Sequence, residues 1–130
     1  MTSQSKKPRL LLVDDERDIE YILKRGLTQE GFEVESYSDP TDALVNYKPN
    51  YYDGIILDIR MPKMSGFELA RMIWQKDSKA KICFLSAYEV YGQEVKSVFP
   101  AQQTCFLLKP MSVSEIVRHL SKEGIFGVKS

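Results

Sequence analysis

Hydrophobic and polar positions follow two different periods along this chain, and the periods take turns. Short apolar runs of strand length are separated by stretches in which apolar residues recur three and four positions apart, which is the spacing of a helix. The runs lie at residues 9–13, 33–37, 54–58, 81–86 and 104–108. The run at 54–58 is unbroken, as in a strand buried on both faces of a parallel sheet. The run at 33–37 alternates and is more polar, so we expect an edge strand there.

Local signals place a helix after each of these strands. Proline follows Asp39, which is typical of an N-cap and first turn, and the pairs Ser65 with Glu68 and Ser112 with Glu115 have the spacing of a capping box. The expected helices span residues 17–30, 40–48, 66–76, 89–99 and 113–123. The fourth is the weakest, because Gly92 lies inside it and Pro100 ends it.

Regular alternation of strands and helices predicts an α/β fold. The expected architecture is a single doubly wound, five-stranded parallel sheet with right-handed crossovers and helices on both faces. With the polar second strand at an edge, the strand order is 2-1-3-4-5, as in flavodoxin-like folds. A chain of 130 residues suits one domain. We expect it at 9–124, with a flexible N-terminus at 1–8 and a tail at 125–130.

Composition narrows the possible partners and the compartment. The 18 basic residues balance the 18 acidic ones, so no overall field favours nucleic acid or an anionic membrane, and we expect direct binding to neither. The apolar runs are too short to cross a bilayer, and the N-terminus lacks the apolar segment of a secretory signal. Cys83 and Cys105 are expected as buried free thiols in a reducing cytosol. The predicted location is cytoplasmic.

Polar residues stand where four of the predicted strands end. Asp14 and Asp15 follow the first strand, Asp58 ends the third, Ser86 the fourth, and Lys109 follows the fifth. Each has an ordinary structural explanation, such as a helix cap, a local hydrogen bond or a solvated charge. Together they belong to one edge of the sheet, where open α/β sheets bind ligands. Ser65 already caps the following helix, which leaves Asp58 available.

The chemistry of this set favours a divalent cation and a phosphoryl group. Three neighbouring carboxylates repel one another and are stabilised by a hard cation, and Mg²⁺ prefers such carboxylate and water ligands. Zinc is not expected, since no His or Cys falls in the motif. A lysine and a hydroxyl suit a tetrahedral dianion, and a carboxylate can be a nucleophile that forms an aspartyl-phosphate. Asp58 is the best candidate, because it alone comes from the central strand.

Four motifs, in order and at strand ends, resemble the receiver domain of two-component response regulators, of the chemotaxis-regulator type. The resemblance runs from about Arg9 to Glu123. The motifs are Val13-Asp14-Asp15-Glu16, Leu57-Asp58-Ile59-Arg60-Met61-Pro62 with Ser65-Gly66, Ser86-Ala87 and Lys109-Pro110. The resemblance implies that the chain is a signalling switch and not an enzyme, although it would assist its own phosphorylation and dephosphorylation.

The resemblance also implies a role for each residue. Asp58 would accept a phosphoryl group from a histidine kinase, a phosphotransfer protein or a small phosphodonor. Asp14, Asp15, Asp58 and the backbone carbonyl of Arg60 would bind magnesium. In the activated state Ser86 would hydrogen-bond the phosphoryl group and Lys109 would pair with it, while Phe106 would be an aromatic switch. An ordinary strand aromatic is the competing interpretation of Phe106.

The resemblance implies that the signal leaves through the face of the fourth helix, fifth strand and fifth helix, toward an output protein or a second copy. Two other functions remain open. A haloacid-dehalogenase-like phosphatase also uses a strand-end aspartate, but its second carboxylate would stand at position 60, which is Arg60, and the chain has no room for a substrate cap. A degenerate receiver used only as a scaffold is disfavoured by the intact Asp58, Ser86 and Lys109.

Overall fold

The computed structural model describes residues 7–87 and 103–122. Its strands form one parallel sheet in the order β2-β1-β3-β4-β5, which confirms the predicted topology. The strands are β1 (Arg9–Val13), β2 (Glu33–Tyr37), β3 (Gly54–Asp58), β4 (Ile82–Ser86) and β5 (Thr104–Leu108). The helices are α1 (Arg17–Gln29), α2 (Pro40–Val45), α3 (Gly66–Lys76) and α5 (Val113–Lys122). The helix expected at 89–99 lies outside the described residues.

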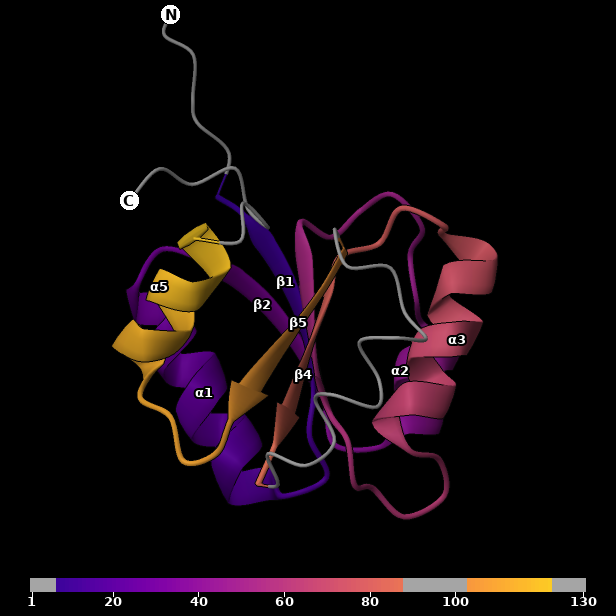
Figure 1. Cartoon of the computed structure of the whole chain (residues 1–130), viewed down its shortest axis with the longest axis horizontal. Coiled ribbons are helices and arrows are strands. Elements are labelled where there is room, and N and C mark those ends of the chain that lie inside the picture. The colour runs from indigo at the N-terminus through magenta and orange to yellow at the C-terminus, as the bar shows by residue number, and fades with distance from the viewer. Residues whose placement is uncertain (1–6, 88–102, 123–130) are drawn as a thin grey trace, which may run out of the picture.

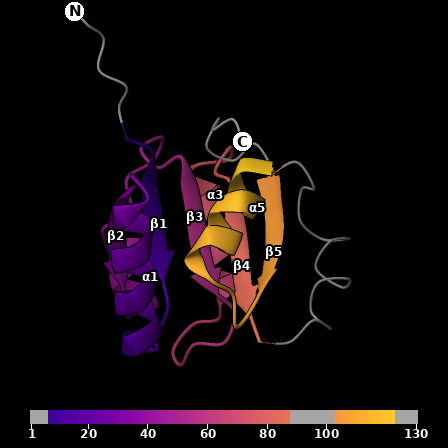
Figure 2. The same ribbon diagram turned by 90° about the vertical axis from the view of Figure 1, so that its left-hand side faces the viewer.

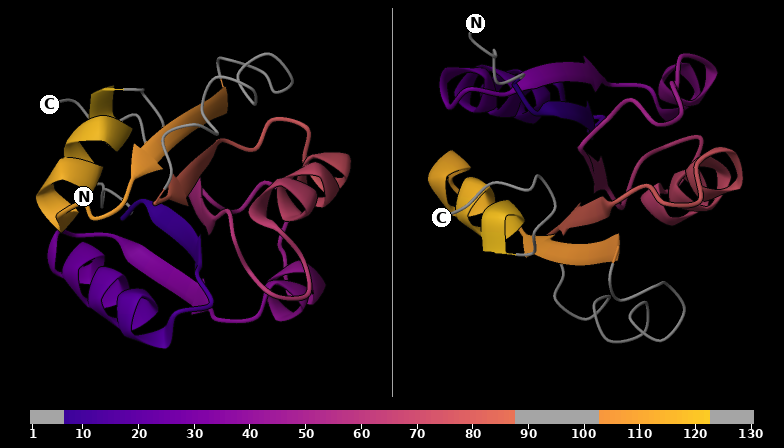
Figure 3. Two further views of the ribbon diagram at one scale, coloured as in Figure 1. Left: turned by 60° about the horizontal axis from the view of Figure 1, so that its bottom comes forward. Right: turned by 90° about the horizontal axis from the view of Figure 1, so that it is seen from above.

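Helices cover both faces of the sheet (Figure 1). Helices α1 and α5 lie together on one face, in front of the strands in Figure 2. Helices α2 and α3 lie on the other face, and both views of Figure 3 separate the two layers. No helix in the described part of the chain is long and apolar enough to cross a membrane.

Strand β3 is the centre of the packing. All five of its residues are buried. Ile55 and Leu57 point into the apolar cluster beneath α2 and α3, and Ile56 points into the cluster beneath α1 and α5. Strand β2, in contrast, has no fully buried residue and forms an edge of the sheet. The carboxyl end of β3 is therefore held in a rigid, apolar frame.

The predicted helix caps are present, and one helix is shorter than predicted. The Asp39 carboxylate accepts a hydrogen bond from the Thr41 backbone N–H at 2.9 Å, and Ser65 and Glu68 form a reciprocal capping box. Helix α2, however, ends at Val45, before the predicted end at residue 48. Tyr47, just beyond the helix, is buried in the apolar cluster, where its hydroxyl donates to the Asp77 carboxylate at 2.8 Å.

The two cysteines are not free thiols, contrary to the sequence prediction. Cys83 in β4 and Cys105 in β5 form a disulfide. They are direct register partners in adjacent strands, and their Cα atoms are 4.4 Å apart, within the range that a disulfide spans. The pairing depends on this register, which the spacing of 22 residues does not reveal.

The loop after β3 folds back tightly against the strand. Gly66, the first residue of α3, donates its backbone N–H to the carbonyl of Ile59 at 2.8 Å. A Cβ atom at position 66 would collide with the backbone carbonyl oxygen of Asp58 and would lie 3.1 Å from the Ile59 Cα. Neither neighbour can yield, because both belong to the backbone. Glycine is therefore required here for close approach.

We expect Gly66→Ala to lower the free energy of unfolding by about 1–3 kcal/mol, the usual cost of forcing an extra methyl into a packed site. Chemical denaturation monitored by circular dichroism would measure the change. Gln75→Ala, on the exposed side of the same helix, is the matched control and should stay within about 0.5 kcal/mol of the unmodified chain. Equal stabilities for the two variants would contradict the packing argument.

Candidate functional site

The carboxyl ends of β1, β3 and β5 bring two buried carboxylates against one lysine. Asp14 directly follows β1 and is fully buried, and Asp58 is the last residue of β3 and is 5% exposed. The Lys109 ammonium lies 3.2 Å from Asp14 Oδ2 and 3.4 Å from Asp58 Oδ1. Residues that are 95 positions apart in the sequence, Asp14 and Lys109, thus share one site because their strands end at the same edge.

Backbone contacts fix the lysine relative to the fourth strand. The Lys109 backbone N–H donates to the carbonyl of Ser86 at 2.7 Å, and Ser86 is the buried last residue of β4. The ends of β1, β3, β4 and β5 therefore meet, as the sequence pattern predicts.

Glu16 is a member of this site that the sequence reasoning missed. Its Oε1 accepts a hydrogen bond from the Lys109 ammonium at 3.1 Å, the shortest of the three carboxylate contacts of that lysine. The available signal was its position directly after Asp14 and Asp15. An exposed glutamate at the start of a helix is common, so the sequence alone did not distinguish it.

The carboxylates fit a hard divalent cation. Within the described residues, the buried Asp15 Oδ1 accepts no hydrogen bond, and the buried Asp14 Oδ2 has no partner besides its ion pair with the Lys109 ammonium. Single oxygens of Asp14, Glu16 and Asp58 lie within 4.8 Å of one another. Carboxylate oxygens are the ligands that Mg²⁺ prefers, and crowded, unsatisfied ones are stabilised by it. The structure adds Glu16 to the acidic residues named from sequence, while Asp15 is close enough to Asp58 to affect its ionisation.

Burial and mutual repulsion shift the ionisation of the site. Burial, the charge of Asp14 and contact with Asp15 raise the pKa of Asp58 to about 7, against the opposing effect of Lys109. Burial also raises the pKa of Asp14. Burial alone would lower the pKa of Lys109, but Asp14, Asp58 and Glu16 raise it, so the ammonium stays charged. The site thus holds a permanent cation among carboxylates that resist full ionisation.

The remaining predicted residues lie around this centre. Arg60 is exposed and follows β3 in the loop that leads to α3. Phe106 is partly buried in β5, where its ring stacks on that of Phe84 with centroids 5.5 Å apart. Its position beside Phe84, in the middle of β4, suits both a switch and an ordinary strand aromatic.

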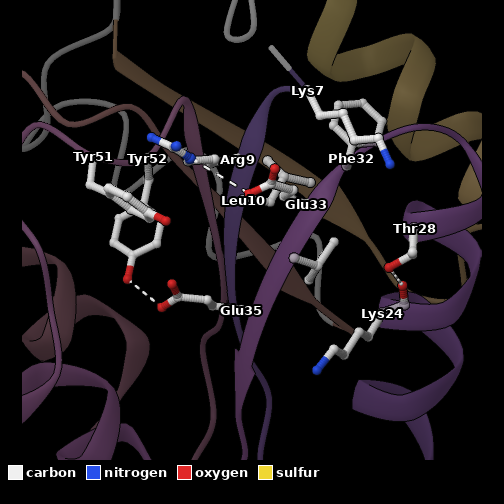
Figure 4. A pocket seen from close by; sticks show the side chains of 11 residues that line it. Lys7, Arg9, Leu10, Lys24, Thr28, Phe32, Glu33, Glu35, Tyr51 and Tyr52 are labelled. Carbon is white, nitrogen blue, oxygen red and sulfur yellow. Dashed lines mark hydrogen bonds and ion pairs between the residues drawn. The ribbon is translucent and has the colours of Figure 1, made fainter.

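A separate cavity of about 350 Å³ lies at the opposite end of the sheet, around β1 and β2 (Figure 4). Three of its charged side chains, those of Arg9, Glu33 and Glu35, have partners within the structure. Arg9 pairs with Glu33 at 3.6 Å and lies over the ring of Tyr51, and Glu35 accepts from the Tyr52 hydroxyl at 2.8 Å. This cavity contains none of the residues of the acidic cluster.

Comparison with known protein families shows which family the chain belongs to. The sequence profile of the response regulator receiver domain matches residues 10–121. The chain belongs to the response regulator receiver family. Such receiver domains are phosphoacceptor switches of two-component systems, and the resemblance seen in the four motifs is confirmed.

Individual relatives of this receiver domain agree. The transcriptional regulatory protein PrrA of Mycobacterium tuberculosis is 36% identical over 110 residues, which are 85% of this chain and 47% of PrrA. The sensor protein EvgS of Escherichia coli is 32% identical over 116 residues, 89% of this chain and 10% of EvgS. The chain therefore spans less than half the length of these curated relatives.

Solved receiver structures have the same fold. The response regulator TrrA of Thermotoga maritima, solved in complex with Mg²⁺ and BeF, is 34% identical with a TM-score of 0.76, covering 89% of this chain and 98% of that one. The HemR receiver domain of Leptospira biflexa, in its non-phosphorylated form, is 30% identical with a TM-score of 0.79, covering 95% and 98%.

We expect the metal-free receiver to lose stability as pH rises from about 4 to about 7. The raised pKa of Asp58 means that the folded chain binds its proton more tightly than the unfolded chain, so ionisation in this window favours unfolding. Asp58→Asn removes this titration. With a chelator present, the free energy of unfolding is measured for Asp58→Asn and for the unmodified chain. The advantage of the variant should be larger at pH 8 than at pH 4 by on the order of 2 kcal/mol.

Denaturant unfolding at several pH values measures this difference. Asp42→Asn, an exposed aspartate of α2, is the control and should follow the unmodified chain at every pH. A constant difference between Asp58→Asn and the unmodified chain across the window would rule out ionisation of Asp58 as the cause.

Proposed function

We propose that Asp58 is the phosphoacceptor of this receiver domain and takes its phosphoryl group from a histidine kinase or a phosphotransfer protein. One observation carries this assignment. Asp58 is the carboxylate at the end of the central strand, and it lies with Asp14 on one side and the Lys109 ammonium 3.4 Å away. A nucleophilic carboxylate beside a fixed cation has both groups that phosphoryl transfer to an aspartate needs.

The proposed reaction is a displacement at phosphorus. An oxygen of ionised Asp58 forms a bond to phosphorus, while the bond from phosphorus to the donor's histidine nitrogen breaks and its electron pair stays on nitrogen. The Lys109 ammonium and the Ser86 hydroxyl stabilise the negative charge of the transferred oxygens. The lysine is already placed for this by its backbone bond to Ser86.

Magnesium is the proposed cofactor of the same site. Asp14, Asp15, Asp58 and the backbone carbonyl of Arg60 would hold it, and when bound it supplies positive charge that offsets the repulsion between the carboxylates and the incoming phosphoryl group. The buried Asp15 Oδ1, which accepts no hydrogen bond, and the buried Asp14 Oδ2, which has only its ion pair with Lys109, support this assignment. So does the TrrA complex, which contains Mg²⁺ with BeF.

Incubation with acetyl phosphate and magnesium should add one phosphoryl group to the unmodified chain, as read by intact-protein mass spectrometry. Asp58→Asn should abolish the increase, because an amide is not a nucleophile for this step. Asp42→Asn should leave it unchanged. A variant lacking Asp58 that gained phosphate at a comparable rate would disprove the assignment.

The same incubation separates the other candidate functions. A haloacid-dehalogenase-like phosphatase would turn over added phosphate esters without retaining phosphate. A receiver that serves only as a scaffold would do neither.

Phosphorylation is proposed to change the face that includes β5 and α5, which acts on an output protein or a second copy of the chain. Leu108, the last residue of β5, is 40% exposed and adds apolar surface beside Lys109. The fourth helix, which completes the proposed face, lies outside the described residues. The main-chain link from Lys109 to Ser86 joins the acidic cluster to β4 and β5 directly.

Beryllofluoride, a mimic of the phosphoryl group, should therefore alter hydrogen exchange across β5 and the start of α5. Exchange in α1 should change little, since its backbone bonds do not depend on Lys109. Mass spectrometry of peptic fragments, with Asp58→Asn as the control that does not respond, measures both regions. Changes limited to residues 58–66 would place the output on another face.

A further inference from the structure

The Lys109 ammonium is shared among three carboxylates, and one of the three differs from the others. Asp14 and Asp58 are buried, with side chains 0% and 7% exposed, whereas the Glu16 side chain is 59% exposed. Glu16 nevertheless makes the shortest contact with the ammonium, 3.1 Å against 3.2 and 3.4 Å. An ammonium has three donors, so the three contacts can coexist.

The position of Glu16 in the chain explains why its side chain reaches the lysine. Glu16 is the N-cap residue of α1, yet its side chain makes no capping hydrogen bond. Its backbone N–H donates instead to Asp14 Oδ1 at 3.0 Å, which ties the start of α1 to the buried carboxylate. The Glu16 carboxylate is thereby left to face Lys109, 93 residues away in the sequence.

A cation bound by Asp14 and Asp58 would compete with this ammonium for the same oxygens. Two positive charges a few ångströms apart repel strongly in a partly buried site. The ammonium can lessen that repulsion without leaving the site, by giving up its contacts with the buried Asp14 and Asp58 and keeping the one with the exposed Glu16. The Lys109 ammonium has three carboxylate partners, and Glu16 is the one that the family resemblance does not assign to magnesium.

We propose that Glu16 is a positioning residue that takes over Lys109 when magnesium occupies Asp14 and Asp58. It acts through the lysine and is not itself a ligand of the metal. By giving the displaced ammonium an acceptor, Glu16 lowers the cost of binding the cation. The inference rests on the proposed magnesium site and assigns to it a residue that tunes its affinity.

The test is a double-mutant cycle on magnesium affinity, measured by isothermal titration calorimetry. Glu16→Gln should weaken binding of Mg²⁺ by about threefold, a change of the size that a mostly exposed ion pair contributes. In a Lys109→Met background, the same substitution should have no effect, because no ammonium remains to be accommodated. Asp18→Asn removes an equal charge from the first turn of α1 and is the control for long-range attraction.

Each outcome of the cycle decides the inference. If Glu16→Gln weakened magnesium binding equally in both backgrounds, Glu16 would be a direct ligand or would attract the cation at long range. Either result would overturn the inference. Unchanged or tighter binding in the unmodified background would overturn it as well. If Lys109→Met fails to fold, as judged by circular dichroism, Lys109→Gln takes its place in the cycle. If the unmodified chain did not bind magnesium, both this inference and the proposed metal site would be overturned. If it bound magnesium but Glu16 and Lys109 showed no coupling, only the role of Glu16 would be overturned.

Discussion

The repulsion between carboxylates at the ends of β1 and β3 is the constraint on which the rest of the site depends. The parallel strands fix Asp14 and Asp58 beside each other, and burial prevents water from screening their charges. Lys109 supplies the one described counter-charge that contacts both. It does not offset burial and repulsion together, since the pKa of Asp58 remains raised. Additional positive charge therefore stabilises the site, and either a bound cation or a proton can supply it.

The apolar frame keeps the carboxylates from relaxing apart. The residues of β1 from Leu10 to Val13 and all of β3 are buried, so neither strand can shift without disrupting both core clusters. Gly66 adds a second restraint by packing its backbone against Asp58. Hydrophobic burial, which dominates folding stability, thus offsets an electrostatic cost that is concentrated at the functional end of the sheet.

Sequence patterns predicted the fold and most of the site because both follow from strand ends. Once the strand order was set by the polar run at 33–37, Asp14, Asp58 and Lys109 had to converge. The misses required information about side-chain direction or register. Glu16 joins the site only because its side chain does not cap α1. The Cys83–Cys105 bond depends on which residues face each other across β4 and β5. Helix α2 ends before its predicted end, and Tyr47 bonds to Asp77.

The disulfide limits how a change at Asp58 can travel. Strands β4 and β5 are paired along their full length, and the Cys83–Cys105 bond joins them covalently three residues before Ser86 and one residue before Phe106. One strand therefore cannot slide past the other. Within the described residues, a change in charge at Asp58 can act instead through groups beyond the covalent link, among them the Lys109 side chain, its backbone bond to Ser86 and the ring of Phe106. Rearrangement at the strand ends, with the sheet itself unchanged, is the conformational response that this architecture permits.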